Sequence, residues 1–222
     1  MIPSDYYVSY VFDCDGVVLD SNKVKTEAFY QTILPYGEAV AQAMVDYHVT
    51  NGGVSRYKKF AHFLEQIIPV HSSQQQVPDL EALLQAYANH VREGLLNCAI
   101  APGIELLRQK TPNSRWLIVS GGDQTELRDV FAQRGIAEWF DGGIFGSPDT
   151  KDEILAREQA ASNILQPALF LGDSKYDYQA ASAAGLDFVF LSDWSEVEGW
   201  ENWAYEKAIK NYFSINNFGQ YL

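Results

Sequence analysis

The sequence has little of several features that would place it in a broad class at once. Only two of its 222 residues are cysteines, Cys14 and Cys98, so it has neither a disulfide framework nor the spacing of a zinc site. It contains no apolar run of the roughly 18–20 residues that a membrane-spanning helix needs. Its first residues lack the basic, apolar and small-residue order of a signal peptide. We therefore expect a cytoplasmic protein with reduced thiols and no membrane partner.

Positive charge is also scarce. The 16 Lys and Arg residues are outnumbered by 29 Asp and Glu residues, which gives a formal net charge of −13 and an isoelectric point near 4.6. This acidity argues against nucleic acid or an anionic membrane surface as a partner. With 47% hydrophobic residues, the chain can bury a sizeable core. Its length suits one domain, or one domain that carries an insert.

The most informative stretch is Tyr6–Ser21. Its aromatic and β-branched residues predict a short buried strand that stops at Asp13-Cys14-Asp15-Gly16. Two carboxylates two residues apart point the same way while the backbone is extended, and Gly16 then allows a sharp turn. A simple turn is the plainer interpretation, because Asp and Gly both favour turns. However, the carboxyl end of a strand is also where α/β sheets bind their ligands.

Residues 22–96 show helical periodicity and no strand signal. The expected helices are Asn22–Leu34, Glu38–Tyr47, Val54–Ile68 and Asp79–Leu96, with a polar connection over Pro69–Pro78.

From Pro102 onward, strand and helix patterns alternate. The expected strands are Trp116–Val119, Gly142–Phe145, Ala168–Leu171 and Phe188–Leu191, and a Trp-rich terminal helix is expected over Ser195–Phe213. The alternation predicts an α/β fold with a doubly wound, Rossmann-like parallel sheet and helices on both faces. We assign residues 1–21 and 97–222 to this core, and residues 22–96 to an inserted all-helical cap domain above the strand ends.

Polar residues follow each expected strand. Each has a plainer interpretation: Ser120-Gly121 could simply lead into a helix, Lys151 could be a solvated charge, and an Asp could be a helix cap. In a parallel sheet, however, all of these strand ends meet at one edge. The residues that converge there are Asp13, Asp15, Ser120, Gly121, Lys151, Asp173 and Asp177.

These segments resemble the four motifs of the haloacid dehalogenase (HAD)-like hydrolase superfamily. The matching stretches are Asp13–Ser21, Ile118–Gly121, Gly146–Pro148 with Lys151, and Leu171–Ser174 with Asp177. The resemblance covers the whole expected core. It points to the phosphatase type with a helical cap after the first motif, similar to phosphoglycolate phosphatases and β-phosphoglucomutases.

The resemblance implies a Mg²⁺-dependent hydrolase that acts on a small phosphorylated metabolite through an aspartyl-phosphate. Asp13 would be the nucleophile, and Asp15 would protonate the leaving oxygen and then activate water. The chemistry of the residues agrees, because covalent catalysis splits one difficult displacement into two easier steps. Buried carboxylates also need compensating charge, which Mg²⁺ and Lys151 would supply.

The resemblance also distributes the remaining roles. The metal ligands would be Asp13, Asp173 and Asp177, with Asp15 contributing its backbone carbonyl. Ser120, the Gly121 N–H and Lys151 would hold the phosphoryl group.

The expected cap has a different charge balance from the rest of the chain. Residues 21–60 hold five basic and three acidic residues, which suits a lid over an anionic substrate. Arg56 follows a Gly-Gly pair and resembles the substrate loop of β-phosphoglucomutase-like members. Lys25 stands where the mutases have a His. We take Arg56, Lys25 and Lys59 as substrate-binding candidates, although Lys59, like its neighbour Lys58, could belong to an ordinary solvated helix face.

Several alternatives stay open. The departure at Lys25 favours hydrolysis over a sugar phosphomutase reaction, which is the second hypothesis, and a non-catalytic HAD-fold protein is a less favoured third. A receiver domain would lack the helical insert, and a dehalogenase would not need an acid at Asp15. The leaving group is undetermined, and the protein could be a monomer or a homodimer.

Residues outside the motifs receive plainer interpretations. Cys14 is expected to serve packing, because a thiol beside carboxylates should be less acidic. The tryptophans near the C-terminus are expected to cover the core or to form a self-association patch. The four histidines show no ligand spacing and are expected at the surface or the edge of the core; they are His48, His62, His71 and His90.

Overall fold

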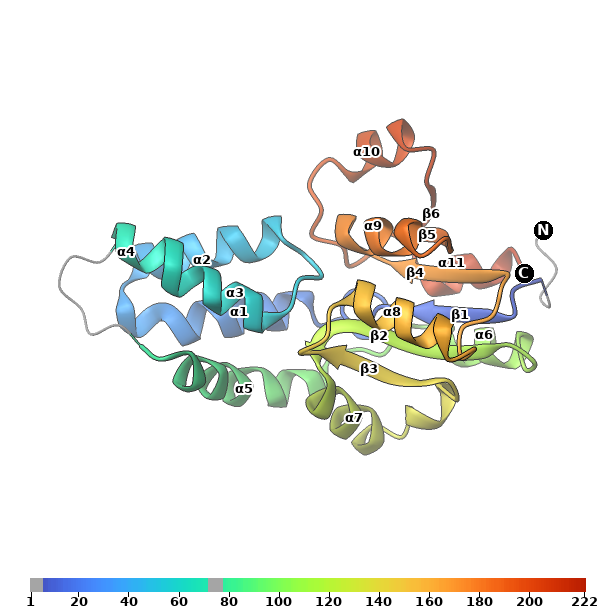
Figure 1. The fold of residues 1–222 in the computed structure, drawn as a ribbon, viewed down its shortest axis with the longest axis horizontal. Coiled ribbons are helices and arrows are strands. Elements are labelled where there is room, and N and C mark those ends of the chain that lie inside the picture. The colour runs from blue at the N-terminus through green and yellow to red at the C-terminus, as the bar shows by residue number, and fades with distance from the viewer. Residues whose placement is uncertain (1–5, 72–77) are drawn as a thin grey trace.

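Six parallel strands form one sheet in the computed structural model, which describes residues 6–71 and 78–222 (Figure 1). The strand order is β3-β2-β1-β4-β5-β6. The chain moves outward from β1 in one direction and from β4 in the other, so a topological switch point lies between them. This confirms the predicted α/β class and parallel sheet. The strands are β1 (Ser9–Phe12), β2 (Arg115–Asp123), β3 (Gly143–Ser147), β4 (Ala168–Gly172), β5 (Asp187–Leu191) and β6 (Lys210–Tyr212).

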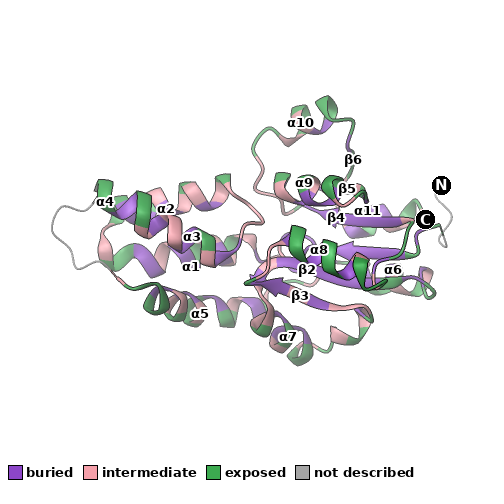
Figure 2. Ribbon diagram, viewed as in Figure 1, coloured by how far each residue is buried: buried purple, intermediate pink, exposed green. Residues whose placement is uncertain are grey.

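Helices cover both faces of the sheet, because the side chains of each strand alternate between the two faces. Tyr10 and Phe12 pack in the cluster that includes α6, α7 and α11, whereas Val11 packs in the cluster with α8 and α9. Figure 2 shows the strands as the buried interior and the outer helix faces as exposed. These helices are α6 (Ile104–Lys110), α7 (Gln124–Gln133), α8 (Lys151–Ala160), α9 (Lys175–Ala183) and α11 (Ile215–Gln220).

A bundle of helices follows β1 directly and precedes β2; we call it the helical insert. Figure 1 shows it beside the end of the sheet toward which the β3 arrowhead points. Within it, α1 packs against α2 and α5, and α3 packs against α5. No helix in the described parts of the chain is long and apolar enough to cross a membrane. The members of the insert are α1 (Asn22–Ile33), α2 (Glu38–Thr50), α3 (Arg56–His62), α4 (Ile68–His71) and α5 (Leu80–Asn97).

The helix predicted over Val54–Ile68 begins later and extends further than expected. It starts at Arg56, passes through a π-helical turn at Phe63–Ile67 and continues as α4. Pro69 lies in α4 rather than in a loop. Residues 72–77 of the predicted polar connection lie outside the described residues.

The terminal helix predicted over Ser195–Phe213 is wrong. The structure has a short helix, α10 (Trp200–Glu206), followed by the edge strand β6. Trp200 and Trp203 pack on Phe190, so these aromatic residues cover the outer part of the core as expected. Their helical spacing dominates the local pattern, whereas a three-residue edge strand leaves almost no periodic signal of its own.

One test of this packing concerns the close approach of α5 to α1. A Cβ placed at Gly94 would lie 2.3 Å from Val24 Cγ1. Ala favours a helix over Gly by about 1 kcal/mol, but overpacking a core typically costs about 1–3 kcal/mol. We expect Gly94→Ala to lower the free energy of unfolding measured in urea. Gly219→Ala, where a Cβ meets nothing within 4 Å, should not lower it. Equal stability of the two variants would contradict the close contact.

Candidate active site

The register of the sheet brings the polar strand ends together. Phe12, the last residue of β1, pairs with Ile118 on β2 and with Leu171 on β4. The backbone N–H of Asp13 then donates to the Leu171 carbonyl oxygen at 3.0 Å. The residues that follow these three strands therefore occupy one edge, beside the switch point.

Three carboxylates cluster at this edge. Asp13, Asp173 and Asp177 each place one oxygen within 4.8 Å of the others, and all three side chains are buried. Burial raises the pKa of Asp173 well above its usual range, and the charges of Asp177 and Asp13 add to the effect. Burial also raises the pKa of Asp13. Three hard oxygen donors that cannot all ionise without compensation suit a Mg²⁺ ion.

Lys151 supplies positive charge to the same cluster. Its Nζ lies 2.9 Å from Asp13 Oδ2 and also contacts Asp177 Oδ1. Burial disfavours the charged lysine, but the two carboxylates outweigh this and raise its pKa. Lys151 is the first residue of α8, whose start is fixed by a capping box between Thr150 and Glu153. Its side chain is 1% exposed, so the plainer interpretation of a solvated charge is wrong.

Asp177 caps a helix, as its plainer interpretation predicts, and it also lies in the acidic cluster. It is the third residue of α9 and forms a capping box with Ser174, whose hydroxyl donates to Asp177 Oδ2 at 2.6 Å. Its other oxygen faces Lys151. One carboxylate thus caps a helix and belongs to the acidic cluster.

Asp15 is held by two groups from the start of the helical insert. Ser21 Oγ donates to its Oδ1 at 2.6 Å, and Lys25 Nζ donates to its Oδ2 at 2.5 Å. Burial opposes ionisation of Asp15, but Lys25 and Ser21 outweigh it and lower its pKa. The structure therefore places Lys25 against the predicted acid/base.

Asn22 is a site residue that the sequence analysis missed. Its amide donates to Asp173 Oδ2 at 2.7 Å and to the Trp194 carbonyl at 2.8 Å. It is the first residue of α1, so it links the insert to the end of β4. An amide directly after the first motif was the only available signal, and it is a weak one because Asn is common at helix starts.

The Ser120-Gly121 segment lies at the end of β2. Ser120 is fully buried, and its Oγ accepts a hydrogen bond from the Gly122 N–H at 3.0 Å. Gly121 borders the pocket described below. Asp123 caps α7 by accepting a hydrogen bond from the Glu126 N–H at 2.9 Å.

A pocket of about 60 Å³ lies between this edge and the helical insert. It brings together the three predicted substrate-binding cations and several core residues. It also contains residues that the sequence analysis did not select. The predicted ones are Asp13, Asp15, Lys25, Arg56, Lys59, Gly121 and Asp173; the additional ones include Asn22, Phe29, His48, Tyr87, Glu126 and Glu196.

Arg56 is engaged with the core. Its guanidinium donates to Glu126 on α7 at 3.1 and 3.2 Å and lies 5.1 Å from the centre of the Tyr87 ring. Next to it, the Tyr57 hydroxyl donates to Asp123 at 2.7 Å. These contacts join α3 to the start of α7.

The expectation for His48 is wrong, because its side chain is buried, 8% exposed, and its Nδ1 lies 2.6 Å from Lys59 Nζ. Burial lowers the pKa of His48 well below its usual value, and the charge of Lys59 adds to this. The His62 ring stacks on the Tyr47 ring, with 3.9 Å between the ring centres. The His71 side chain lies outside the described residues. Within the described ranges, the group with metal-ligand spacing is the Asp cluster.

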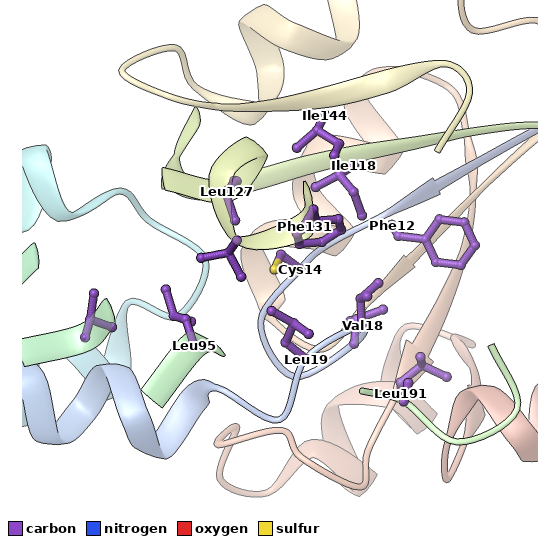
Figure 3. Close-up of a cluster of buried hydrophobic side chains, with 14 of the residues drawn as sticks. Phe12, Cys14, Val18, Leu19, Leu95, Ile118, Leu127, Phe131, Ile144 and Leu191 are labelled. Carbon is purple, nitrogen blue, oxygen red and sulfur yellow. The ribbon is translucent and has the colours of Figure 1, made fainter. Parts of the chain in front are cut away.

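Cys14 lies between Asp13 and Asp15 in the chain, and its side chain packs in a cluster of buried hydrophobic residues. Figure 3 shows its sulfur among side chains of the same cluster, including Ile118 and Phe131. Burial raises the pKa of the Cys14 thiol well above its usual value. This agrees with the predicted packing role.

The sequence matches the family model described as haloacid dehalogenase-like hydrolase over residues 9–185. The chain belongs to this family of hydrolases. No curated protein matches the sequence at a significant level.

Solved structures of the family share the fold. A HAD-like family protein from Streptococcus pneumoniae has a TM-score of 0.67 and 19% identity, with 98% of this chain and 99% of that chain covered. A predicted phosphoglycolate phosphatase from Haemophilus somnus has a TM-score of 0.68 and 16% identity, with 84% and 86% covered. A β-phosphoglucomutase from Clostridium difficile has a TM-score of 0.69 and 20% identity, with 95% and 92% covered. At these identities the likeness shows the fold alone.

The contact between insert and core predicts the effect of a small change at Gly121. A Cβ there would lie 2.3 Å from the Gly53 carbonyl oxygen, and neither backbone can move cheaply. Gly121→Ala keeps the backbone N–H but should push the 51–54 loop away from the core. We expect faster hydrogen exchange in a peptide that contains Gly53, with the β1 and β4 peptides unchanged.

The matched control is Gly52→Ala, whose Cβ would lie an ordinary 3.5 Å from Ser174 Cβ. It should leave exchange in the loop near the wild-type rate. Unchanged exchange in Gly121→Ala would show that the loop does not rest on Gly121.

Proposed function

We propose that this HAD-like hydrolase is a Mg²⁺-dependent phosphatase that acts on a small phosphorylated metabolite through an aspartyl-phosphate. The observation that carries the proposal is the position of Asp13. It stands at the switch point, borders the pocket, is paired with Lys151 at 2.9 Å and shares a buried cluster with two further carboxylates. A carboxylate held in this way is suited to attack phosphorus.

The surrounding residues position the nucleophile. The Cys14 N–H donates to Asp13 Oδ1 at 2.7 Å, and Lys151 holds Oδ2. Lys151 also attracts a phosphoryl group that approaches Asp13. The Gly121 N–H and the Ser120 hydroxyl are the proposed donors to the non-reacting phosphoryl oxygens.

Asp15 is the proposed acid and base. Its lowered pKa keeps it a carboxylate in the free protein, which is the form that removes a proton from water. Protonating a leaving oxygen requires the acid form instead. Lys25 and Ser21 therefore position Asp15 and also favour its carboxylate form over its acid form.

The acidic cluster fits a Mg²⁺ ion, with Asp13, Asp173 and Asp177 as carboxylate ligands and Asp15 as a carbonyl ligand. When bound, the ion would offset the negative charge of the ligands and the phosphoryl group. Asn22 orients Asp173 through its 2.7 Å hydrogen bond.

The assignment of residues to a catalytic core and a cap is part of the same proposal. Residues 1–21 and 97–222 would form the catalytic core, and residues 22–96 the cap that encloses the substrate. A cytoplasmic location and a monomer or homodimer remain expectations from the sequence.

A sugar phosphomutase of the β-phosphoglucomutase type is the second candidate, and Arg56 at the pocket is the observation in its favour. Two observations favour hydrolysis. The Arg56 guanidinium is paired with Glu126, and Lys25 rather than His contacts Asp15. Incubation with a sugar 1-phosphate separates the two: the phosphatase releases phosphate, and the mutase yields the 6-phosphate.

Asp13→Asn should abolish turnover of an aryl phosphate and the acid-stable phosphoenzyme, because an amide is a poor nucleophile. Phosphate release and acid-quenched labelling measure the two effects. Asp193→Asn, a change at an exposed carboxylate outside the cluster, should retain both. If Asp13→Asn kept about a tenth of wild-type turnover, Asp13 would not be the nucleophile.

Metal removal tests the acidic cluster. Dialysis against EDTA should abolish turnover, and added Mg²⁺ should restore it. Ca²⁺ should inhibit, because it accepts more oxygen ligands in a looser geometry and would engage both oxygens of the nucleophile. Full activity after dialysis, without added metal, would falsify the proposed metal role of Asp173 and Asp177.

A further inference from the structure

Three cationic side chains of the helical insert line the pocket, and two of them already have carboxylate partners. Lys25 is paired with Asp15 at 2.5 Å, and Arg56 is paired with Glu126 at 3.1 Å. The charge of each is therefore already compensated by a carboxylate of the protein. The third cation, Lys59, is in a different situation.

Lys59 is buried without a carboxylate within 4.0 Å, as far as the described residues go. Its side chain is 2% exposed. Its Nζ lies 2.6 Å from His48 Nδ1 and 3.3 Å from the His48 carbonyl oxygen, and 5.6 Å from the centre of the Phe29 ring. An ammonium group has three donors, and burying it without an anion is costly. Its place on the wall of the pocket suggests that the anion comes with the ligand.

The charges around Lys59 agree with this picture. Burial, the charge of Lys25 and a smaller contribution from Lys151 lower the pKa of Lys59, which is about 7. Asp15 and Glu196 act in the opposite direction but do not restore the usual value. From α2, His48 faces Lys59 as a neutral ring, because burial and the nearby lysines lower its pKa.

Glu196 does not replace the missing partner. Its carboxylate accepts from the Thr26 hydroxyl at 3.3 Å, and burial raises its pKa. It lines the pocket beyond the reach of an ion pair with Lys59.

We propose that Lys59 binds a second anionic group of the substrate, a carboxylate or a further phosphate, separate from the phosphoryl group at Asp13. The proposal rests on the phosphatase function above and narrows it to phosphorylated acids or doubly phosphorylated compounds. His48 is the positioning residue: when Lys59 is protonated, the ring Nδ1 and the His48 carbonyl oxygen accept two of its hydrogens and leave the third for the ligand. Binding of the anion raises the pKa of Lys59, so ligand binding takes up a proton near neutral pH.

Non-hydrolysable phosphonates test the proposal without turnover. Calorimetry would compare phosphonoacetate, 3-phosphonopropionate and 4-phosphonobutyrate with alkylphosphonates of the same chain length, in the presence of Mg²⁺. We expect at least one acid to bind roughly tenfold or more tightly than the alkylphosphonate of the same chain length, which lacks the carboxylate, as for a charge-assisted contact. Diphosphonates of the same lengths distinguish a second phosphate from a carboxylate.

Lys59→Gln should remove this preference and leave the affinity for alkylphosphonates nearly unchanged. Lys58→Gln is the matched control, because it removes the same charge from the neighbouring exposed position and should keep the preference. A wild-type protein with no preference at any chain length would overturn the proposal, and so would a Lys59→Gln protein that kept the preference.

The pH dependence gives a second readout on the wild-type protein. At pH 6 Lys59 is mostly charged before binding, whereas at pH 8 binding must include protonation. The ratio of acid to alkylphosphonate affinity should therefore fall between these pH values by up to about tenfold, and Lys59→Gln should abolish the change. A ratio independent of pH in the wild type would count against Lys59.

Failure of the parent proposal has its own signature. A protein that hydrolyses no aryl phosphate with Mg²⁺ would refute the phosphatase function. The phosphonate affinities would still report whether Lys59 selects a second anion.

Discussion

The carboxylates buried at the ends of β1 and β4 must be compensated by positive charge, and neighbouring lysine side chains supply part of it. Lys151, at the start of α8 in the core, forms an ion pair with Asp13. The helical insert contributes Lys25 to Asp15 and Arg56 to Glu126. Desolvation offsets most of the attraction within a buried ion pair, so such a pair adds little net stability. Separating its partners would leave a buried charge uncompensated, so the pair constrains their relative position. The insert is therefore held beside the site by its ion pairs with Asp15 and Glu126.

The apolar core supports this arrangement. One cluster runs from the sheet face around Phe12 and Ile118 through Cys14 and Leu19 to Leu95 in the insert. Figure 3 shows Phe12 and Ile118 on the strands, Cys14 and Leu19 in the turn between β1 and α1, and Leu95 near the end of α5. Insert and sheet thus share a single packed interior at the point where the chain leaves the core. Close packing of this kind limits how far Asp15 and Lys25 can shift relative to Asp13.

The sequence was enough to predict the parallel sheet, the helical character of the described residues within 22–71 and 78–96, and the convergence of the motifs, because each depends on local pattern or on strand ends sharing an edge. It could not predict which cation of the helical insert would lack a carboxylate partner among the described residues. That depends on α3 packing beside α7, which pairs Arg56 with Glu126, and on α2 bringing His48 to Lys59. Both contacts depend on helix packing rather than on spacing along the chain. The edge strand β6 was missed because three residues are too few to show a period.

The position of β1 has a consequence for how the chain must fold. β1 is the first strand made, yet it lies in the middle of the sheet, where Ser9 pairs with Arg115 on one side and with Ala168 on the other. Its edge toward β2 stays unpaired until the insert has been synthesised, and its edge toward β4 stays unpaired until Ala168–Gly172 has followed. Such long-range pairing slows folding and leaves a strand open to wrong partners. The insert lies between β1 and β2 in the chain, so its packed helices connect two strands that are neighbours in the sheet.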